Sequence, residues 1–138
     1  MKNQYWSFSK ANGFRHSSAI GASLPVYEHI GYKNFYDGDA GVFNENQLTL
    51  FQVVIWNNVS GKVLTDDQRI VFKNWIEGGR GFIGIHAAGD DSHQWVWYES
   101  AVIQTHFSHH NISPYLDTAT LHLNIDVDNH QLSDVEHF

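Results

Sequence analysis

The chain of 138 residues contains no cysteine and only two prolines. Without cysteine it has neither a disulfide framework nor a thiolate nucleophile, so reactions through a cysteine thioester are excluded. It also lacks an apolar run of about 18 residues, so no transmembrane helix is predicted. The first residues lack the apolar stretch of a signal peptide. We therefore expect a soluble, cytoplasmic protein, although a leader removed upstream remains an alternative.

Basic residues are scarce, with 8 Lys and Arg against 15 Asp and Glu, a formal charge of −7. No cluster of basic side chains interrupts this acidity, which argues against a nucleic-acid partner. The length fits a single domain over residues 1–138, whose core would bury roughly two-thirds of the unfolded chain's surface. Ten histidines are the compositional outlier. Their number is compatible with polar sugar or metal sites, but it fits a surface without function better.

A strand–helix–strand pattern occupies the middle of the chain. Residues 51–56 form an apolar, β-branched run that predicts a strand buried on both faces. In the helix that follows, Thr65 and Gln68 form a capping box, and the glycines at 78 and 79 end it. A second apolar strand comes directly afterwards. This alternation predicts a parallel sheet covered by helices.

The remaining elements are predicted from shorter signals. Ser17 or Ser18 begins a first helix that runs to about His29, and Pro25 inside it predicts a short or broken helix. Residues 119–127 alternate between apolar and polar side chains, which is typical of a half-exposed strand. Further short strands are expected over residues 4–9 and 33–36, and helices over residues 45–50 and 95–104.

The segment from Gly81 to Asp90 is the most informative part of the sequence. An apolar run punctuated by glycine ends at His86, and small residues follow in a tight turn. This is the layout of a nucleophile elbow, in which a strand turns sharply and lifts one side chain above the sheet. The lifted side chain here is an imidazole, which can act as a base, an acid or a metal ligand.

Three polar loops are expected to meet beyond the carboxyl ends of the strands, where open parallel sheets bind ligands. In a flavodoxin-like order the first, third and fourth strands are neighbours spaced about 4.8 Å apart. The mixture of donors, acceptors and imidazoles suits a polyhydroxylated or carboxylated small molecule. Some of these polar residues could instead be turn formers, Asn57, Asn58 and Asp91 above all. The loops carry Asn12, Arg15 and His16, then Asn57, Asn58 and Ser60, then His86, Asp90 and Asp91.

Two further clusters leave alternatives open. His106 and His110 would share a face of a helix and could ligate one metal ion, but the segment could equally be an exposed loop. The aromatic side chains of Trp95, Trp97 and Tyr98 could stack on sugar rings or complete the core. The residues alone do not decide either case.

The same motifs resemble the ThuA-like family, named for trehalose utilisation, within the class I glutamine amidotransferase-like superfamily. The resemblance implies an α/β fold of the three-layer α/β/α flavodoxin-like type, with a mostly parallel sheet in which His86 replaces the amidotransferase cysteine. It also implies a role in carbohydrate metabolism, on oxidised disaccharides such as keto-sugars. The matching stretches are residues 9–16, 53–58, 64–68, 78–88, 95–98 and 107–110.

The polar loops and the resemblance together lead to a hypothesis for the role of each polar residue. His86 would be a general base or a metal ligand, and His16 and His110 would be its acid/base partners or further ligands of a divalent ion such as zinc. Arg15 would orient an anionic or hydroxyl group of a small sugar-derived ligand, the expected partner in place of a nucleic acid or a membrane. The predicted substrate-binding residues are Asn12, Arg15, Asn57, Asn58, Asp90, Trp97 and Tyr98.

Two functions remain open at this point. One is an enzyme of the hydrolase, lyase or isomerase type that acts on a sugar derivative; the other is a non-catalytic sugar-binding or interaction module on the same fold. Glutamine amidotransfer is excluded, because no cysteine is present. The family domain usually continues well beyond this length, so the chain would be a short form or a domain truncated at the C-terminus. A missing sheet edge would favour homo-oligomers.

Overall fold

The computed structural model describes residues 5–29, 38–104 and 106–109, together with the single residues Ser113, Thr118 and Thr120. The chain divides into two compact units, residues 1–108 and residues 109–138, and every helix and strand reported below lies in the first. The predicted strand over residues 33–36, most of the one over 119–127, and His110 lie outside the described residues. Within the described residues, no helix is both long and apolar enough to span a bilayer.

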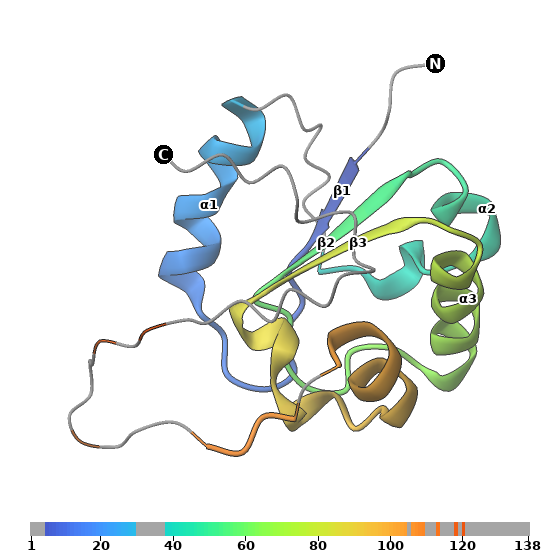
Figure 1. The fold of residues 1–138 in the computed structure, drawn as a ribbon. Helices are drawn as coiled ribbons and strands as arrows, with labels where there is room; N and C mark the ends of the chain where they lie inside the picture. The colour runs from blue at the N-terminus through green and yellow to red at the C-terminus, as the bar shows by residue number, and fades with distance from the viewer. Residues whose placement is uncertain are drawn as a thin grey trace. The chain divides into compact units, whose positions relative to one another are not determined.

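Three parallel strands form the sheet in the order β1-β2-β3 (Figure 1). They are β1 (Tyr5–Phe8), β2 (Val53–Asn57) and β3 (Gly81–Ile85). The register pairs Trp6 with Val54 and Val54 with Phe82. The prediction that these three strands are neighbours is therefore confirmed, and the carboxyl ends of all three meet at one edge of the sheet.

Helices lie on both faces of this sheet, as the predicted α/β/α arrangement requires. In Figure 1, α1 (Ser17–His29) lies on one side of the strands, and α2 (Glu45–Leu48) and α3 (Asp66–Glu77) lie on the other. Short helical turns complete the described chain: η1 (Ala40–Val42), η2 (His86–Gly89), η3 (Asp91–His93) and the π-helix η4 (Tyr98–Ile103). The last of these confirms the helix expected over residues 95–104.

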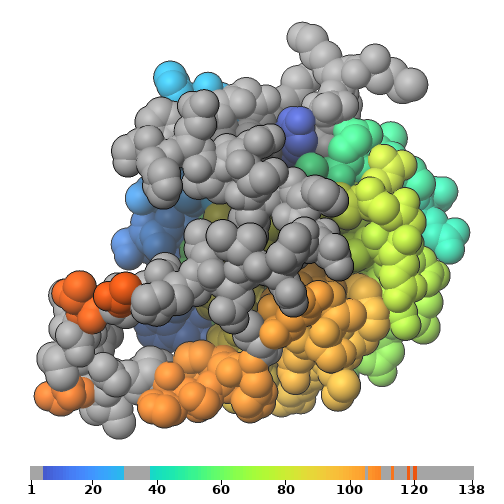
Figure 2. All heavy atoms as spheres, viewed as in Figure 1, coloured from blue at the N-terminus to red at the C-terminus, as the bar shows by residue number. Residues whose placement is uncertain are grey.

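The hydrophobic core lies between the sheet and α3 and is mostly aromatic. Trp56 of β2 stacks on Phe72 of α3 with 5.4 Å between ring centroids. Phe82 of β3 and Tyr98 of η4 pack against Trp56 from the neighbouring strand and the π-helix. Figure 2 shows this part of the chain, residues 86–104 in yellow to orange, directly beside α3 in yellow-green. Burial of these rings holds the three strand ends in fixed positions.

Reciprocal side-chain hydrogen bonds define the N-terminus of α3. The Thr65 hydroxyl accepts from the Gln68 backbone N–H at 3.2 Å, while the Gln68 side chain accepts from the Thr65 N–H at 2.9 Å. Both arms of the predicted capping box are therefore present.

The expectation for the first helix is wrong in one respect, because α1 runs unbroken through Pro25 to His29. The proline is exposed, and its ring removes only the backbone N–H that would donate to Gly21. Ile20 and Tyr27 are buried on either side of the proline, and this burial stabilises the helix although the bond is missing.

Candidate functional site

Two loops are locked together at the carboxyl edge of the sheet. The backbone N–H of Asn12 donates to the Ser60 carbonyl at 2.8 Å, and the Ser60 hydroxyl donates to the Phe14 carbonyl at 2.8 Å. Gly61 permits this approach, because its φ is +80° and an added Cβ would lie 2.7 Å from the Gly13 nitrogen. The loop after β1 and the loop after β2 therefore form one rigid support.

The elbow predicted at His86 is present. His86 follows the last residue of β3 directly and adopts φ +52°, a left-handed conformation that non-glycine residues rarely take. Asn58 has φ +55° at the corresponding place after β2. An added Cβ on Gly84 would lie 3.3 Å from the Ala88 Cβ, which is tighter than most Cβ contacts, so glycine at this position eases the close approach of the turn. Strained backbone of this kind concentrates at functional sites.

The elbow brings His86 against His16, which immediately precedes α1. The two imidazole rings meet edge to face, with 4.5 Å between centroids and 81° between their planes. The His16 ring also contacts the Phe14 ring, with 4.8 Å between centroids. Of the three predicted histidines the structure therefore joins two, and His110 lies outside the described residues.

A chain of amides supports the His86 ring from behind. His86 Nδ1 lies 3.1 Å from Asn58 Oδ1, and Asn58 Nδ2 donates to Asn57 Oδ1 at 3.0 Å. Asn57 Nδ2 in turn donates to the Ser23 hydroxyl of α1 at 2.8 Å. Both asparagines are buried, with 0% and 3% of their surface exposed. They support the histidine and do not present their amides to solvent.

Sequence reasoning missed Ser23, although a signal for it exists. Ser23 lies three residues after Ile20 and four before Tyr27, the two buried residues of α1. It is thus a hydroxyl on the face of the helix that packs against the sheet. A polar residue in an apolar helical stripe is the pattern that could have identified it.

Phe14 is the second residue that the sequence did not assign to the site. It lies on the surface rather than in the core, since 75% of its surface is exposed. Its ring lies beside the histidine pair as an accessible apolar face.

Two more predicted residues border this edge of the sheet. Arg15 is exposed, and its Nη1 donates to the Ser9 carbonyl at 2.6 Å, which fixes one side of the guanidinium. Asn12 donates from Nδ2 to the Lys62 carbonyl at 2.7 Å. Arg15 therefore keeps further donors for a ligand, whereas the Asn12 amide group holds its own loop in place.

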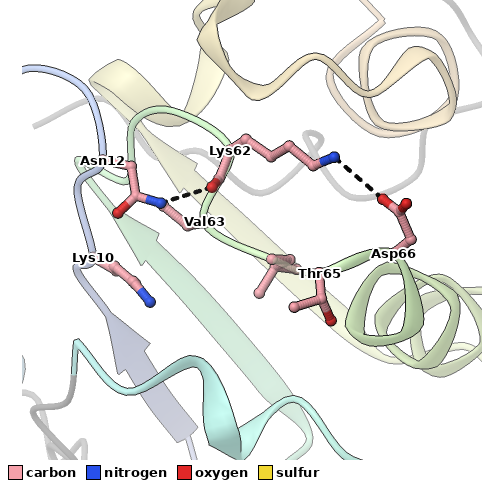
Figure 3. A pocket seen from close by; sticks show the side chains of 7 residues that line it. Lys10, Asn12, Lys62, Val63, Thr65 and Asp66 are labelled. Atoms are coloured by element: carbon pink, nitrogen blue, oxygen red, sulfur yellow. Dashed lines mark hydrogen bonds and ion pairs between the residues drawn. The ribbon is translucent and has the colours of Figure 1, made fainter.

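Asn12 also lines a surface cavity of about 500 Å³ beside the start of α3 (Figure 3). Lys10 and Asn12 reach it from the loop after β1, and Lys62 and Thr65 reach it from the loop after β2. Lys62 is paired with Asp66 across 3.4 Å. The cavity thus lies at the carboxyl edge of the sheet, but the histidines do not line it.

The other predicted binding residues have structural partners. Asp90 accepts the Ser92 N–H at 2.9 Å and the Ser92 hydroxyl, and so caps η3. Trp97 donates to Glu77 at the end of α3, and Lys73 lies over its ring at 5.6 Å. That end of α3 precedes β3, whereas His86 follows β3, so Trp97 lies away from the histidine pair.

Tyr98 belongs to the core. None of its surface is exposed, and its hydroxyl donates to the Ala88 carbonyl at 2.7 Å. Burial raises the pKa of the Tyr98 hydroxyl well above its ordinary value, and the nearby charge of Asp90 raises it further. Of the two alternatives for this aromatic residue, the structure therefore favours packing: Tyr98 supports the turn that carries His86.

His93 is a buried histidine that the sequence did not single out. Its ring lies between two backbone carbonyls, with Nδ1 3.2 Å from Gly61 O and Nε2 3.1 Å from Ala87 O. Only 2% of its surface is exposed. His93 thereby ties the loop after β2 to the turn after His86.

The described residues do not support the predicted metal site. Among them, no group of three or more His, Cys, Asp or Glu side chains is arranged to hold an ion. Zinc sites use at least three protein ligands, and the described part of the chain supplies only the pair His16 and His86. His106 has no described metal partner either, because His110 lies outside the described residues.

Comparisons with known proteins agree with this architecture. The family model described as ThuA, trehalose utilisation, matches residues 6–137. The crystal structure of a ThuA-like protein from Bacteroides uniformis is similar, with a TM-score of 0.62 and 18% sequence identity. The alignment covers 78% of this chain and 46% of that one, so the chain spans just under half the length of this relative. A comparison with curated proteins gives no match.

Proposed function

This chain belongs to the ThuA family, within the class I glutamine amidotransferase-like superfamily, and from that premise we propose that it binds a small sugar-derived ligand beside His16 and His86. The observation that carries the proposal is the edge-to-face histidine pair at the carboxyl edge of the sheet, with His86 at positive φ. Parallel α/β sheets bind their ligands at this edge.

The groups around the pair suit a sugar derivative. The exposed ring of Phe14 offers an apolar face, and aromatic faces stack on pyranose rings. Arg15 has donors left for a hydroxyl or carboxylate oxygen. Because the His16 ring contacts both the Phe14 ring and the His86 ring, a sugar stacked on Phe14 would have its polar edge near the histidines.

In the enzymatic form of the proposal, His86 moves a proton to or from a sugar carbon or oxygen. A positioned imidazole contributes about 10²–10⁴-fold in such a step. His16 lies close enough to share or return the proton. This chemistry fits a hydrolase, lyase or isomerase acting on a keto-sugar, and it needs no thiolate.

A non-catalytic sugar-binding module is the second candidate. The observation in its favour is that the elbow carries an imidazole where an amidotransferase needs a thiolate, in a chain without cysteine. A fold can keep its ligand edge after the nucleophile is lost. This candidate predicts stoichiometric binding and no turnover.

Calorimetric titration of wild-type protein and His86→Asn with trehalose and with keto-trehalose tests the proposal. Asparagine tolerates the left-handed backbone at position 86, so the substitution removes the imidazole and keeps the turn. We expect wild-type binding and at least a tenfold loss of affinity in the variant. Monitoring the same ligands by NMR for turnover separates the enzyme from the binding module.

His29→Asn is the matched control. His29 is exposed and ends α1, which places it about 20 Å along the helix from His16. Its substitution should leave binding unchanged. Equal affinities for wild type and His86→Asn, or no binding of either sugar by the wild type, would contradict the proposal.

A further inference from the structure

A chain of hydrogen-bonded side chains connects His86 with the backbone of α1, and we propose that this chain holds the proton of the His86 ring on Nδ1. It consists of Ser23, Asn57 and Asn58. The inference deepens the proposed function and rests on it, because it concerns the same histidine. It makes these three residues positioning residues, which act on a ligand only through His86.

The direction of these hydrogen bonds is set at Ser23, where the series of side chains meets the backbone of α1. The Ser23 hydroxyl donates to the backbone carbonyl of Ile20 at 2.8 Å. A carbonyl oxygen can only accept, and a hydroxyl has one proton to give. Ser23 therefore meets its other neighbour as an acceptor, and the Asn57 amide turns its Nδ2 toward Ser23, at 2.8 Å.

The two amides carry this direction to the elbow. With Nδ2 toward Ser23, Asn57 presents Oδ1 to Asn58, whose Nδ2 donates to it at 3.0 Å. Asn58 then presents its own Oδ1 to His86 Nδ1, 3.1 Å away. Because Oδ1 can only accept, Nδ1 must be the donor. A neutral imidazole has a single N–H, so Nε2 keeps its lone pair.

Burial makes the direction matter. Asn57 is 0% exposed and Asn58 is 3% exposed, so water does not replace a lost partner. The reversed chain, with every amide turned over, preserves the other bonds but costs the bond from Ser23 to Ile20. One net hydrogen bond corresponds to roughly a fivefold preference between the two directions. The bond from Ser23 to Ile20 should therefore shift the ratio of the two His86 tautomers by the same factor.

The consequence for the site is that one atom, Nε2 of His86, can act as the base. Nε2 of His86 is the nitrogen left to accept a proton or a hydrogen bond from a ligand, and within the described residues no hydrogen bond occupies it. An imidazole with Nε2–H would instead donate to the ligand and could not act as a base. Ser23 lies 63 residues away in sequence, and it therefore determines whether His86 Nε2 accepts a proton from a ligand or donates a hydrogen bond to it.

The tautomer is measured directly by NMR of protein labelled with ¹⁵N-histidine, without any ligand. Long-range nitrogen–proton spectra distinguish Nδ1–H from Nε2–H in the neutral ring, and His86→Asn identifies the His86 signals by their disappearance. In the wild type we expect mainly the Nδ1–H form. In Ser23→Ala the ratio of Nδ1–H to Nε2–H should fall roughly fivefold, one net hydrogen bond.

Two variants control for merely structural effects. Ser23→Thr keeps a hydroxyl that can donate to the preceding helical turn, so it should restore the wild-type ratio. Ser18→Ala makes the same change at an exposed position of the same helix and should leave the ratio unchanged. A wild-type His86 that is mainly Nε2–H, or an unchanged ratio in Ser23→Ala, would overturn the inference.

These outcomes are separable from those of the proposed function. The tautomer is a property of the free protein, so it can be confirmed even if neither sugar binds. Conversely, loss of sugar binding in His86→Asn together with an unchanged tautomer in Ser23→Ala would leave the proposed function in place and remove only the positioning chain.

Discussion

The exposed side chain of Phe14 is the feature that distinguishes the proposed site from an ordinary contact between two loops. Large apolar rings on a surface are common when isolated, but this one packs against His16 at 4.8 Å, and His16 packs against His86 at 4.5 Å. His16 thus contacts both of the other rings at this edge of the sheet. An apolar ring and a proton-transfer group close to one another match the apolar face and the hydroxyl groups of a sugar.

Phe14→Ala should therefore weaken sugar binding without affecting the fold. An aromatic stacking contact is worth about 0.5–1.5 kcal/mol beyond its buried area, so we expect an affinity loss of about threefold to tenfold by calorimetry. The urea midpoint should not change, because 75% of the Phe14 surface is already exposed. Phe14→Tyr keeps the ring face and should bind like the wild type. Equal binding by Phe14→Ala would remove the ring from the site.

Among the secondary-structure elements, helix α1 links two parts of the site, the histidine pair and the amide chain behind it. His16 precedes its first residue, and Ser23, two turns later, directs the amide chain to His86. The helix contains Pro25, which removes one backbone hydrogen bond, and it runs on to His29 regardless. The position of α1 against the sheet therefore depends on its buried face and not on helix propensity.

Pro25→Ala should stabilise the protein, because it restores the N–H that a helix interior needs. The penalty of an interior proline is about 3 kcal/mol relative to alanine, reduced by up to about 1 kcal/mol because proline also restricts the unfolded chain. We expect the free energy of unfolding in urea to rise by about 2–3 kcal/mol. Pro25 is exposed, so no packing is lost.

Pro25→Gly gives the matching control for this helix. Glycine restores the same N–H but costs about 1 kcal/mol more than alanine in a helix interior. It should therefore gain less than Pro25→Ala. A decrease in stability in both variants would mean that the proline ring itself makes a contact that the helix requires.

Over the whole molecule, the sequence predicted what depends on neighbouring residues. The capping box at Thr65 and Gln68, the strand ending at the elbow and the order of the three strands are all confirmed. Each follows from a local pattern or from the general rules of parallel sheets. The meeting of His16 with His86 follows from the same rules, because both residues come after parallel strands, β1 and β3, whose carboxyl ends lie at the same edge of the sheet.

What the sequence did not reveal depends on pairs that are distant in the chain. Nothing near Asn57 indicates that its amide bonds to Ser23, 34 residues earlier. Tyr98 and Trp97 are adjacent aromatic residues, yet one is fully buried and the other lies against α3. Composition cannot separate a core ring from a binding ring, since both are apolar. Only the path of the chain after η3 decides between them.

Tyr98 couples this core to the elbow and makes the stability of the whole molecule depend on pH. Burial raises the pKa of its hydroxyl, with Asp90 as a second cause. In the unfolded chain a tyrosine ionises near pH 10. Above that pH the unfolded state releases the Tyr98 proton while the folded state retains it. The stability from this group is thus complete below about pH 10 and is lost as the pH rises further.

Tyr98→Phe separates the two contributions of this residue. At neutral pH the variant leaves the buried Ala88 carbonyl without its donor, which should cost about 1–3 kcal/mol in urea unfolding. Above about pH 10 the wild type should lose about 1.4 kcal/mol per pH unit more than the variant. The two stability curves therefore converge, and since all other titrating groups are shared, their difference isolates Tyr98. Curves that stay parallel from pH 8 to 11 would mean that Tyr98 ionises as readily in the folded protein as in the unfolded chain.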